Sequence, residues 1–239
     1  MPDLTLVLEA SAGSGSLALL RPGAVVAEAE VPMRGHDGER MMPALVEMLR
    51  VAGVSTADLA RIVCGAGPGG FTSLRIAAAI AKGLACSLGV ELWGVSSLAL
   101  IAAGEFGDAA AAPGGRPVIA VLDALRGEWY AQRFTLHADG AVTAHGAPTR
   151  RDLASLAAEL AAPLSAEAGT GGALIVGVGG DTFQGGRHAL PRARDVARLN
   201  PGPLLYPVEL AGWEPEYGRL AEAQVKWEQA HGRSLGAVG

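Results

Sequence analysis

A glycine-rich turn that runs into an apolar stretch is the first feature of the sequence that could do chemistry. It reads GAGPGG at residues 65–70 and is followed by FTSLRIAAAIAKGLA. A glycine loop at the start of a helix can bind an anion, because free backbone N–H groups point at the ligand there. We therefore expect exposed N–H groups at Gly69, Gly70 and Phe71, with Thr72 as a cap of the following helix.

The loop matches neither of the two common phosphate-binding motifs in full. A P-loop requires GxxxxGK[ST], and no lysine stands at the required place. Gly65, Gly67 and Gly70 have GxGxxG spacing, and Glu91 follows near the distance of the acidic residue in a dinucleotide site. That fingerprint belongs to an N-terminal βαβ unit, whereas the segments before this loop predict a meander. A tight strand-to-helix turn therefore remains an alternative to an anion site.

Candidates for catalysis outside the loop are few. Glu9 follows the first apolar run, and a carboxylate at the end of a strand could hold a metal ion through water. Asp123 and Glu128 flank a turn, where carboxylates are either a catalytic pair or, more often, ordinary turn residues. The five histidines include no pair four positions apart, so the sequence has no HxxxH metal pair. It also has no GxSxG nucleophile motif.

The composition fits a globular protein with a substantial core. Of the 239 residues, 50% are hydrophobic and 18% are charged, which predicts one large domain or two small ones. A net charge of −5 without a run of basic residues argues against unaided nucleic-acid binding. No window of about 18 apolar residues is free of charge, and the N-terminus lacks signal-peptide features. Cys64 and Cys86 are expected to be reduced core thiols of a cytoplasmic protein.

The elements that must position these residues follow from the apolar patterns. Three short alternating runs predict an antiparallel meander, followed by alternating helices and strands. The first helix should end at Gly53, and Ser96 or Ser97 should cap a short helix. The predicted strands are 4–10, 15–23, 24–32, 58–65 (central) and 90–95, and the predicted helices are about 38–52, 72–88 and 97–104.

This order predicts an α/β fold of the ribonuclease-H-like, actin-like type. Residues 1–106 should form one subdomain, with a mixed sheet flanked by helices. Residues 107–239 should form a smaller, degraded copy, with a hairpin over 118–134, a helix that starts near Asp152 and a strand near 173–180. A closing helix could pack back on the first subdomain.

Two of the predicted helices carry more apolar surface than one sheet can cover. On a helical wheel each has two adjacent apolar strips, and Arg75 and Lys82 define a narrow polar stripe on the second helix. One strip can face the sheet, while the other needs another chain or another part of this chain. The strips are Met41, Leu45, Met48, Ala52 and Met42, Val46, Leu49 on the first helix, and Leu74, Ala81, Ala85, Leu88 and Ile76, Ile80, Leu84 on the second.

The stretch GAGPGGFTSLRIAAAIAKGLA resembles the GxGPGSFTGLRIG…AKGLA signature of the TsaB (YeaZ) family of bacterial tRNA threonylcarbamoyladenosine biosynthesis proteins. Four further segments are similar to that family in the same order: RGHDGERMMPAL, WGVSSL, VLDALRGEWYAQRF and EPEYGRLAEAQVKW. They cover most of residues 1–135 and the end of the chain, whereas about 150–205 shows no resemblance.

The resemblance implies a non-catalytic subunit with an actin-like ATPase fold. Such a subunit pairs with TsaD, which transfers the threonylcarbamoyl group to adenosine 37 of tRNAs that read ANN codons, and the ATPase TsaE joins the pair. Without TsaD a homodimer can form through the same helices. The resemblance further implies tRNA contact only through the complex, ATP or ADP only in the complex, no metal and no membrane. The implied partner interface is Met41, Met42, Leu45, Met48, Leu49, Leu74, Ala77, Ala81, Leu84 and Ala85.

The chain departs from the family pattern in the region that could bind a nucleotide. The serine after GPG is Gly70 here, the glycine after FT is Ser73, and the first-strand DTA is replaced from Glu9 onward. These changes weaken an anion or nucleotide site at Glu9, Gly69, Gly70 and Thr72 more than they weaken the scaffold. The rival hypothesis is an autonomous actin-like ATPase or small-molecule kinase that uses Glu9 and the loop. A peptidase is the weakest reading.

Overall fold

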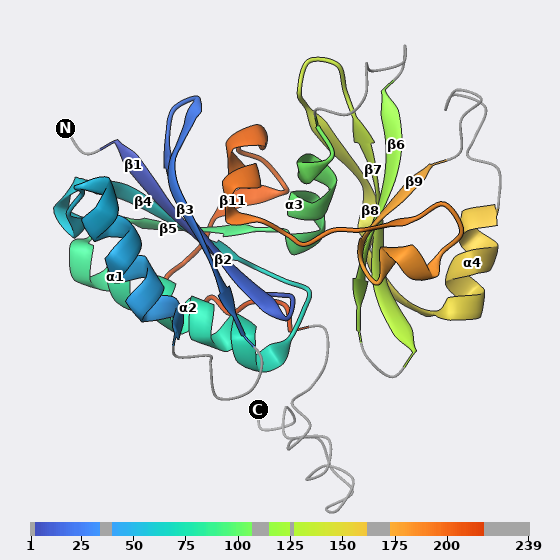
Figure 1. The fold of residues 1–239 in the computed structure, drawn as a ribbon, viewed down its shortest axis with the longest axis horizontal. Coiled ribbons are helices and arrows are strands. Elements are labelled where there is room, and N and C mark those ends of the chain that lie inside the picture. The colour runs from blue at the N-terminus through green and yellow to red at the C-terminus, as the bar shows by residue number, and fades with distance from the viewer. Residues whose placement is uncertain (1–2, 34–39, 107–114, 125–126, 162–172, 218–239) are drawn as a thin grey trace, which may run out of the picture.

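Two mixed sheets with helices form the chain, as the computed structural model in Figure 1 shows for residues 3–33, 40–106, 115–124, 127–161 and 173–217. The first sheet has six strands in the order β11-β5-β4-β1-β2-β3, and the second has five in the order β10-β9-β6-β7-β8. The predicted α/β fold class is confirmed. The first sheet consists of β1 (Leu4–Glu9), β2 (Ser14–Arg21), β3 (Ala24–Pro32), β4 (Leu59–Gly65), β5 (Glu91–Val95) and β11 (Leu205–Pro207).

Strand alternation divides the first sheet into two apolar faces. In β1, Leu6 and Leu8 enter the core beneath one face, whereas Val7 enters the core beneath the other. β2 and β3 continue the antiparallel meander, and β4 lies parallel to β1 with Leu8 opposite Cys64. β4 is central, as its apolar end predicts, because a strand buried on both faces has no polar side to expose.

Helices α1 (Met41–Ala52) and α2 (Phe71–Leu88) cover one face of this sheet and share a single apolar core with it. α1 ends at Gly53, whose left-handed backbone (φ 65°) allows its N–H to bond to the carbonyl oxygens of Arg50 and Leu49. Pro43 falls in the first turn of α1, where its missing N–H breaks no helical bond. The predicted boundaries of both helices therefore agree closely with the structure.

Helix α3 (Ser97–Gly104) lies between the two sheets (Figure 1). Every residue from Ser97 to Ala103 is buried, and the Ser96 hydroxyl caps the helix by accepting from the N–H of Ala99 at 3.3 Å. α3 shares one core with Val63 of the first sheet and Phe134 of the second, and the 3-10 helix η4 (Ala193–Arg198) packs against it. A helix with a sheet on both sides can be apolar around its whole circumference.

The second sheet repeats the connectivity of the first. A meander of three strands is joined by a strand parallel to its first member, so that β6-β7-β8 with β9 corresponds to β1-β2-β3 with β4. Helix α4 (Leu153–Ala161) connects β8 to β9. At its start the Asp152 carboxylate accepts a hydrogen bond from the N–H of Ser155 at 2.7 Å. The predicted degraded copy is thus visible in the strand order. The strands are β6 (Arg116–Asp123), β7 (Glu128–Leu136), β8 (Val142–Asp152), β9 (Leu174–Val178) and β10 (Arg187–His188).

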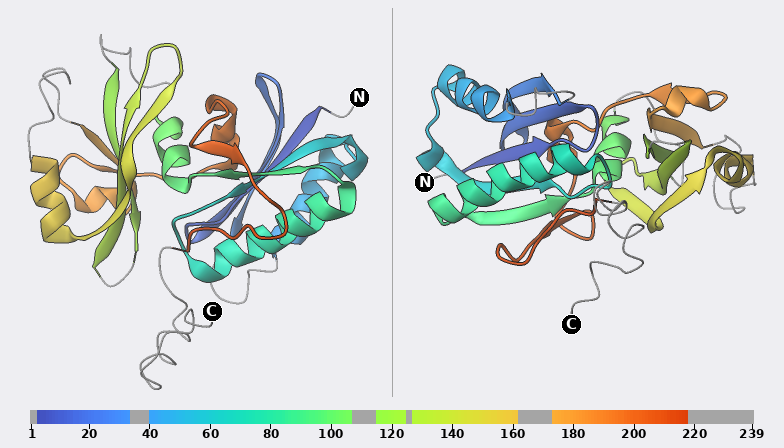
Figure 2. Two further views of the ribbon diagram at one scale, coloured as in Figure 1. Left: turned by 180° about the vertical axis from the view of Figure 1, so that it is seen from behind. Right: turned by 90° about the horizontal axis from the view of Figure 1, so that it is seen from below.

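The chain returns to the first sheet after it has built the second, which the sequence patterns did not predict. β11 pairs antiparallel with β5, and residues 208–217 then run along α2 (Figure 2). Trp213 packs on the α2 core, and its carbonyl oxygen accepts from the Lys82 ammonium group at 2.9 Å. The division of the chain at residue 106 stays a prediction, but this return segment crosses it. The predicted closing helix lies outside the described residues.

Two smaller expectations, on the cysteines and on membrane crossing, need correction or comment. Cys64 is a buried thiol as expected, but Cys86 is exposed on α2, because it lies on the side of the helix that faces away from the sheet. By length and composition alone, α2 is also the one helix among the described residues that could cross a membrane. Its inner face packs on the first sheet, which is the pattern of a core-facing helix.

We expect Leu100→Ala in α3 to lower the free energy of unfolding by about 3 kcal/mol, because it leaves a cavity between two packed sheets. Leu100 is fully buried in the core that joins the sheets. Chemical denaturation followed by circular dichroism measures the change. Val51→Ala is the control, since Val51 is 70% exposed and its truncation should cost less than about 0.5 kcal/mol. Equal losses in the two variants would contradict the placement of α3.

Candidate functional site

Glu9, the one carboxylate predicted at a strand end, is completely buried. Its Oε1 accepts from the backbone N–H of Ser11 at 2.5 Å, and its Oε2 accepts from the hydroxyl of Ser97 at 2.9 Å. The carboxyl group therefore ties the end of β1 to the turn that follows and to the first residue of α3. Both oxygens are therefore engaged in hydrogen bonds inside the protein.

Burial raises the pKa of Glu9, and the hydrogen bonds from Ser11 and Ser97 only partly offset that effect. The same burial raises the pKa of the neighbouring Cys64 thiol, and the charge of Glu9 adds to the shift. The Glu9 carboxyl group also explains the glycine at position 65, the end of β4, because a Cβ atom there would collide with it. The environment thus shifts the Glu9 carboxyl group toward its protonated form compared with an exposed carboxyl group.

The glycine loop is bound to the β1–β2 turn. The N–H of Gly70 donates to the carbonyl oxygen of Ser11 at 2.8 Å, and Gly69 lies so close to Ser11 that a Cβ would collide with it. Of the N–H groups expected to be free, the one at Gly70 is therefore already used. Thr72 is not the cap, because α2 begins at Phe71 and its N-cap is Gly70, which has no side chain.

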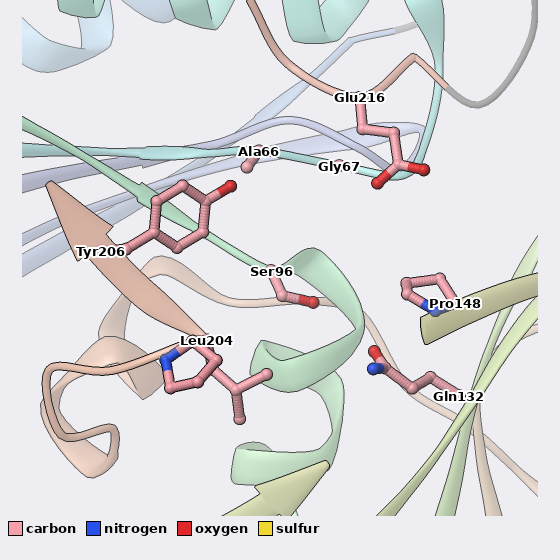
Figure 3. A pocket seen from close by; sticks show the side chains of 9 residues that line it. Ala66, Gly67, Ser96, Gln132, Pro148, Leu204, Tyr206 and Glu216 are labelled. Carbon is pink, nitrogen blue, oxygen red and sulfur yellow. The ribbon is translucent and has the colours of Figure 1, made fainter. Parts of the chain in front are cut away.

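A cavity of about 140 Å³ lies between the two sheets beside this loop (Figure 3). Binding sites for small molecules and cofactors usually have 300–1,000 Å³, so the cavity is too small for a nucleotide. Ser96 was predicted only as a helix cap, and Gln132, Tyr206 and Glu216 were not predicted as site residues, since these side chains converge only in the folded chain. Its lining residues are Ala66, Gly67, Ser96, Gln132, Pro148, Pro203, Leu204, Tyr206 and Glu216.

The residues predicted to contact a partner lie mostly inside the chain. Met42 is 41% exposed and Leu84 is half-buried, but the others face the first sheet. Leu45→Asp or Ala81→Glu would therefore destabilise the fold itself, because each puts a charge into the core. The buried members are Met41, Leu45, Met48, Leu49, Leu74, Ala77, Ala81 and Ala85.

A second apolar strip on each helix does face outward. On α1, Met42 and Val46 are exposed, and on α2 an exposed line through Ala79 and Gly83 is flanked by half-buried side chains. Both helices lie on the same face of the sheet (Figure 2). The return segment covers only the flank of α2 that carries Lys82. We call the outward strips the docking face: Met42, Val46, Ile76, Ala79, Ile80, Gly83 and Leu84.

Among the other candidate ligands, Glu128 and two of the histidines contact side chains of other kinds. Asp123 and Glu128 flank the β6–β7 turn, as predicted, and Glu128 lies 3.6 Å from the Arg150 guanidinium. His137 and His145 bond to threonine hydroxyls on neighbouring strands. Within the part of the chain that the structure describes, no three His, Cys, Asp or Glu side chains gather as a metal site.

Comparison with known proteins assigns the chain to a family. A family model described as TsaD: tRNA N6-adenosine threonylcarbamoyltransferase matches residues 30–150, about half of the chain. The chain belongs to this family. The match includes α1, the glycine loop, α2 and α3, which are the elements that form the docking face and surround Glu9.

Individual relatives narrow the assignment to TsaB/YeaZ. The chain is 34% identical over 125 residues to tRNA threonylcarbamoyladenosine biosynthesis protein TsaB of Escherichia coli, and 35% identical over 126 residues to that of Bacillus subtilis. The matched region covers 52% of this chain and 52% of each relative, so the similarity spans about half the length of these proteins. The predicted resemblance to the TsaB/YeaZ family is confirmed.

Solved structures agree over most of the fold. One protein, described as uncharacterized with similarity to peptidase YeaZ from Pseudomonas aeruginosa, superimposes with a TM-score of 0.71 at 25% identity. That match covers 91% of this chain and 100% of the other. YeaZ from Pseudomonas aeruginosa gives a TM-score of 0.66 at 26% identity, over 82% of this chain and 89% of its own. The two-sheet arrangement is therefore that of YeaZ proteins.

We expect Glu9→Gln to gain stability relative to the unsubstituted chain as the pH rises above 4.5. The folded chain holds the Glu9 proton more tightly than the unfolded chain, so ionisation above the ordinary carboxyl pKa of 4.5 lowers the free energy of unfolding. Glutamine keeps an acceptor for Ser11 but does not ionise. Urea denaturation at several pH values from 4 to 8 on both proteins gives the difference, in which all shared titrating groups cancel.

Glu47→Gln is the matched control, because the hydrogen bond from Arg50 lowers the pKa of this exposed carboxylate. Relative to the unsubstituted chain, Glu47→Gln should therefore lose a little stability above pH 4.5, which is the opposite sign to the change expected for Glu9→Gln. A Glu9→Gln difference that stays constant with pH would refute a raised pKa for Glu9.

Proposed function

We propose that this chain is the non-catalytic dimerisation and scaffold subunit of the complex that makes N6-threonylcarbamoyladenosine at position 37 of tRNAs reading ANN codons. In this role it activates the catalytic subunit TsaD. The observation that carries the proposal is the docking face, an apolar surface on α1 and α2 whose residues are exposed or only half-buried among the described residues. Met42 and Val46 are 41% and 55% exposed, although the opposite side of α1 is fully packed.

The shape of this surface suits helix-to-helix packing with a partner. Ala79 and Gly83 are small and exposed in the middle of α2, and a Cβ at Gly83 would meet nothing within 4 Å. Small residues let a second helix approach closely, while Ile80 and Leu84 beside them provide apolar area. An interface of about 800 Å² per partner is an ordinary size for a specific complex. The partner strip is thus the outward one, and the inward residues support it from the core.

Catalysis by this chain itself is not part of the proposal. Glu9 is engaged in internal hydrogen bonds, and the cavity between the sheets is smaller than a nucleotide needs. ATP or ADP would enter only with the assembled complex, where TsaE is the ATPase and TsaD binds the tRNA. A homodimer through the docking face would form when TsaD is absent. A cytoplasmic location belongs to the same proposal.

The rival function is an autonomous actin-like ATPase or small-molecule kinase. It requires steady ATP turnover by the isolated chain and loss of that turnover in Glu9→Ala. We expect the isolated chain to release phosphate from ATP no faster than Glu9→Ala does, in a coupled assay without TsaD. Turnover that depends on Glu9 would favour the rival function over the scaffold.

We expect Gly83→Arg to abolish co-purification with TsaD of the same organism and to stop tRNA modification by the reconstituted complex. The added side chain projects from the docking face into open space, so the chain itself should stay folded. Gly83→Ala should instead keep binding and stabilise the chain by about 1 kcal/mol, because alanine is the better helix former. Size-exclusion chromatography, circular dichroism and a nucleoside assay provide the three readouts.

Gly202→Arg is the matched control, since a Cβ at this exposed glycine also meets nothing within 4 Å and the residue belongs to neither α1 nor α2. It should bind TsaD normally. If Gly83→Arg and Gly202→Arg both bind TsaD as the unsubstituted chain does, the docking face is not the interface.

A further inference from the structure

The cavity between the sheets is lined by side chains from both of them. Gln132 on β7 and Pro148 on β8 come from the second sheet, while the glycine loop, Ser96 and β11 come from the first (Figure 3). Glu216, on the return segment, stands at the opposite wall from Gln132 and completes the lining. An occupant would therefore touch both halves of the molecule at once.

The Gln132 side chain provides one unpaired acceptor. It is only 7% exposed, and its amide Nε2 donates to the carbonyl oxygen of Gly146 at 2.7 Å. A carbonyl can accept only from the NH₂ group, so this bond fixes the orientation of the amide. Among the described residues the Oε1 atom then has no hydrogen-bond donor, although buried polar atoms are almost always paired. An occupant with an N–H group would satisfy it.

The opposite wall provides a negative charge. Among the described residues, no ion pair or hydrogen bond engages the Glu216 carboxylate, and its backbone N–H is anchored to the carbonyl oxygen of Ala66 at 2.7 Å. The Tyr206 ring lies against Gly94, and its hydroxyl points toward Ala66 (Figure 3). Burial and the charge of Glu216 raise the pKa of Tyr206, which keeps that hydroxyl protonated. Glu216 is thus the one charged side chain among the lining residues, which include no basic side chain.

The size of the cavity limits what can fill it. A volume of about 140 Å³ is close to that of cavities that hold a single six-atom ring, such as benzene. The occupant must be small and cationic and must carry N–H donors toward two walls. A guanidinium group meets these conditions, because it is planar, always charged, and has five N–H donors and no acceptor. It can also lie against an aromatic ring such as that of Tyr206.

We propose that this cavity binds a guanidinium group, which donates to the Glu216 carboxylate on one wall and to the Gln132 amide oxygen on the other. The group can belong to a free small molecule or to an arginine side chain of another protein. The proposal is independent of TsaD binding, since the cavity lies between the sheets and the docking face lies on the outer side of α1 and α2.

The test uses the full chain and agmatine as the probe. We expect saturable binding with a Kd on the order of 1 mM, seen by titration calorimetry and by a shift of the Gln132 side-chain NH₂ signals in NMR spectra. Urea, which is similar in shape but uncharged, should give no saturable effect at the same concentrations. Glu216→Gln should weaken agmatine binding by about tenfold, because it removes the charge-assisted hydrogen bond.

Glu214→Gln is the matched control, since Glu214 is exposed on the same segment but does not line the cavity. It should bind agmatine normally. Gln132→Leu should weaken binding too, and circular dichroism checks that it is folded. Equal affinity in Glu216→Gln and in the unsubstituted chain, equal effects of urea and agmatine, or a titration that does not saturate would each overturn the proposal.

An N-acetylated, amidated Gly-Arg-Gly peptide distinguishes the two sources of the group. Peptide binding as strong as that of agmatine, and equally sensitive to Glu216→Gln, assigns the cavity to an arginine of a partner protein. Binding of agmatine without binding of the peptide assigns it to a free small molecule. Both results require the same two acceptors, so both support the guanidinium site.

Discussion

A buried carboxyl group holds together the parts of the first sheet that matter most for the rest of the molecule. Glu9 joins the end of β1 to the following turn through Ser11 and to the start of α3 through Ser97. This turn also holds the glycine loop, because the carbonyl oxygen of Ser11 accepts a hydrogen bond from the N–H of Gly70. One side chain thereby fixes where α2 begins and where α3 begins. The environment of this group is structural, because it is completely buried and both of its oxygens accept hydrogen bonds from within the chain.

The two helices positioned in this way serve opposite purposes. α3 is enclosed between two sheets and needs no polar side, so it acts as the shared core of both halves. α2 has only one sheet beneath it, and its outer side carries small and apolar residues around Gly83. A glycine inside a helix costs stability relative to alanine, so its presence on an open surface favours a role in close contact with another helix. The family assignment and this surface support the same proposed scaffold.

Sequence reasoning predicted the regular elements well because their apolar periods are strong. The alternation in β1 and the cap at Ser96 are local signals, and the structure contains both. β8 was missed because none of its residues is buried. β11 was missed because it has only three residues, one of them Pro207, and pairs with a strand that is distant in the sequence. A helical wheel identifies the two apolar strips on each helix but does not show which of them faces the sheet, because that depends on how the helix packs. Gln132 and Glu216 lie in two of the segments that resemble the TsaB (YeaZ) family, but nothing in either segment indicates a ligand site, and folding alone brings the two side chains together.

The return of the chain to the first sheet bears on how the protein is made. β5 is synthesised early, yet its outer edge stays unpaired until β11 emerges, and the Lys82 flank of α2 stays bare until Trp213 arrives. During translation the first half therefore presents an open strand edge and an apolar helix side, which are the features that promote aggregation of nascent chains. A ribosome-bound chain of this protein reaches its complete first sheet only after the second has been made. Fragments that stop before residue 205 carry the same open edge permanently.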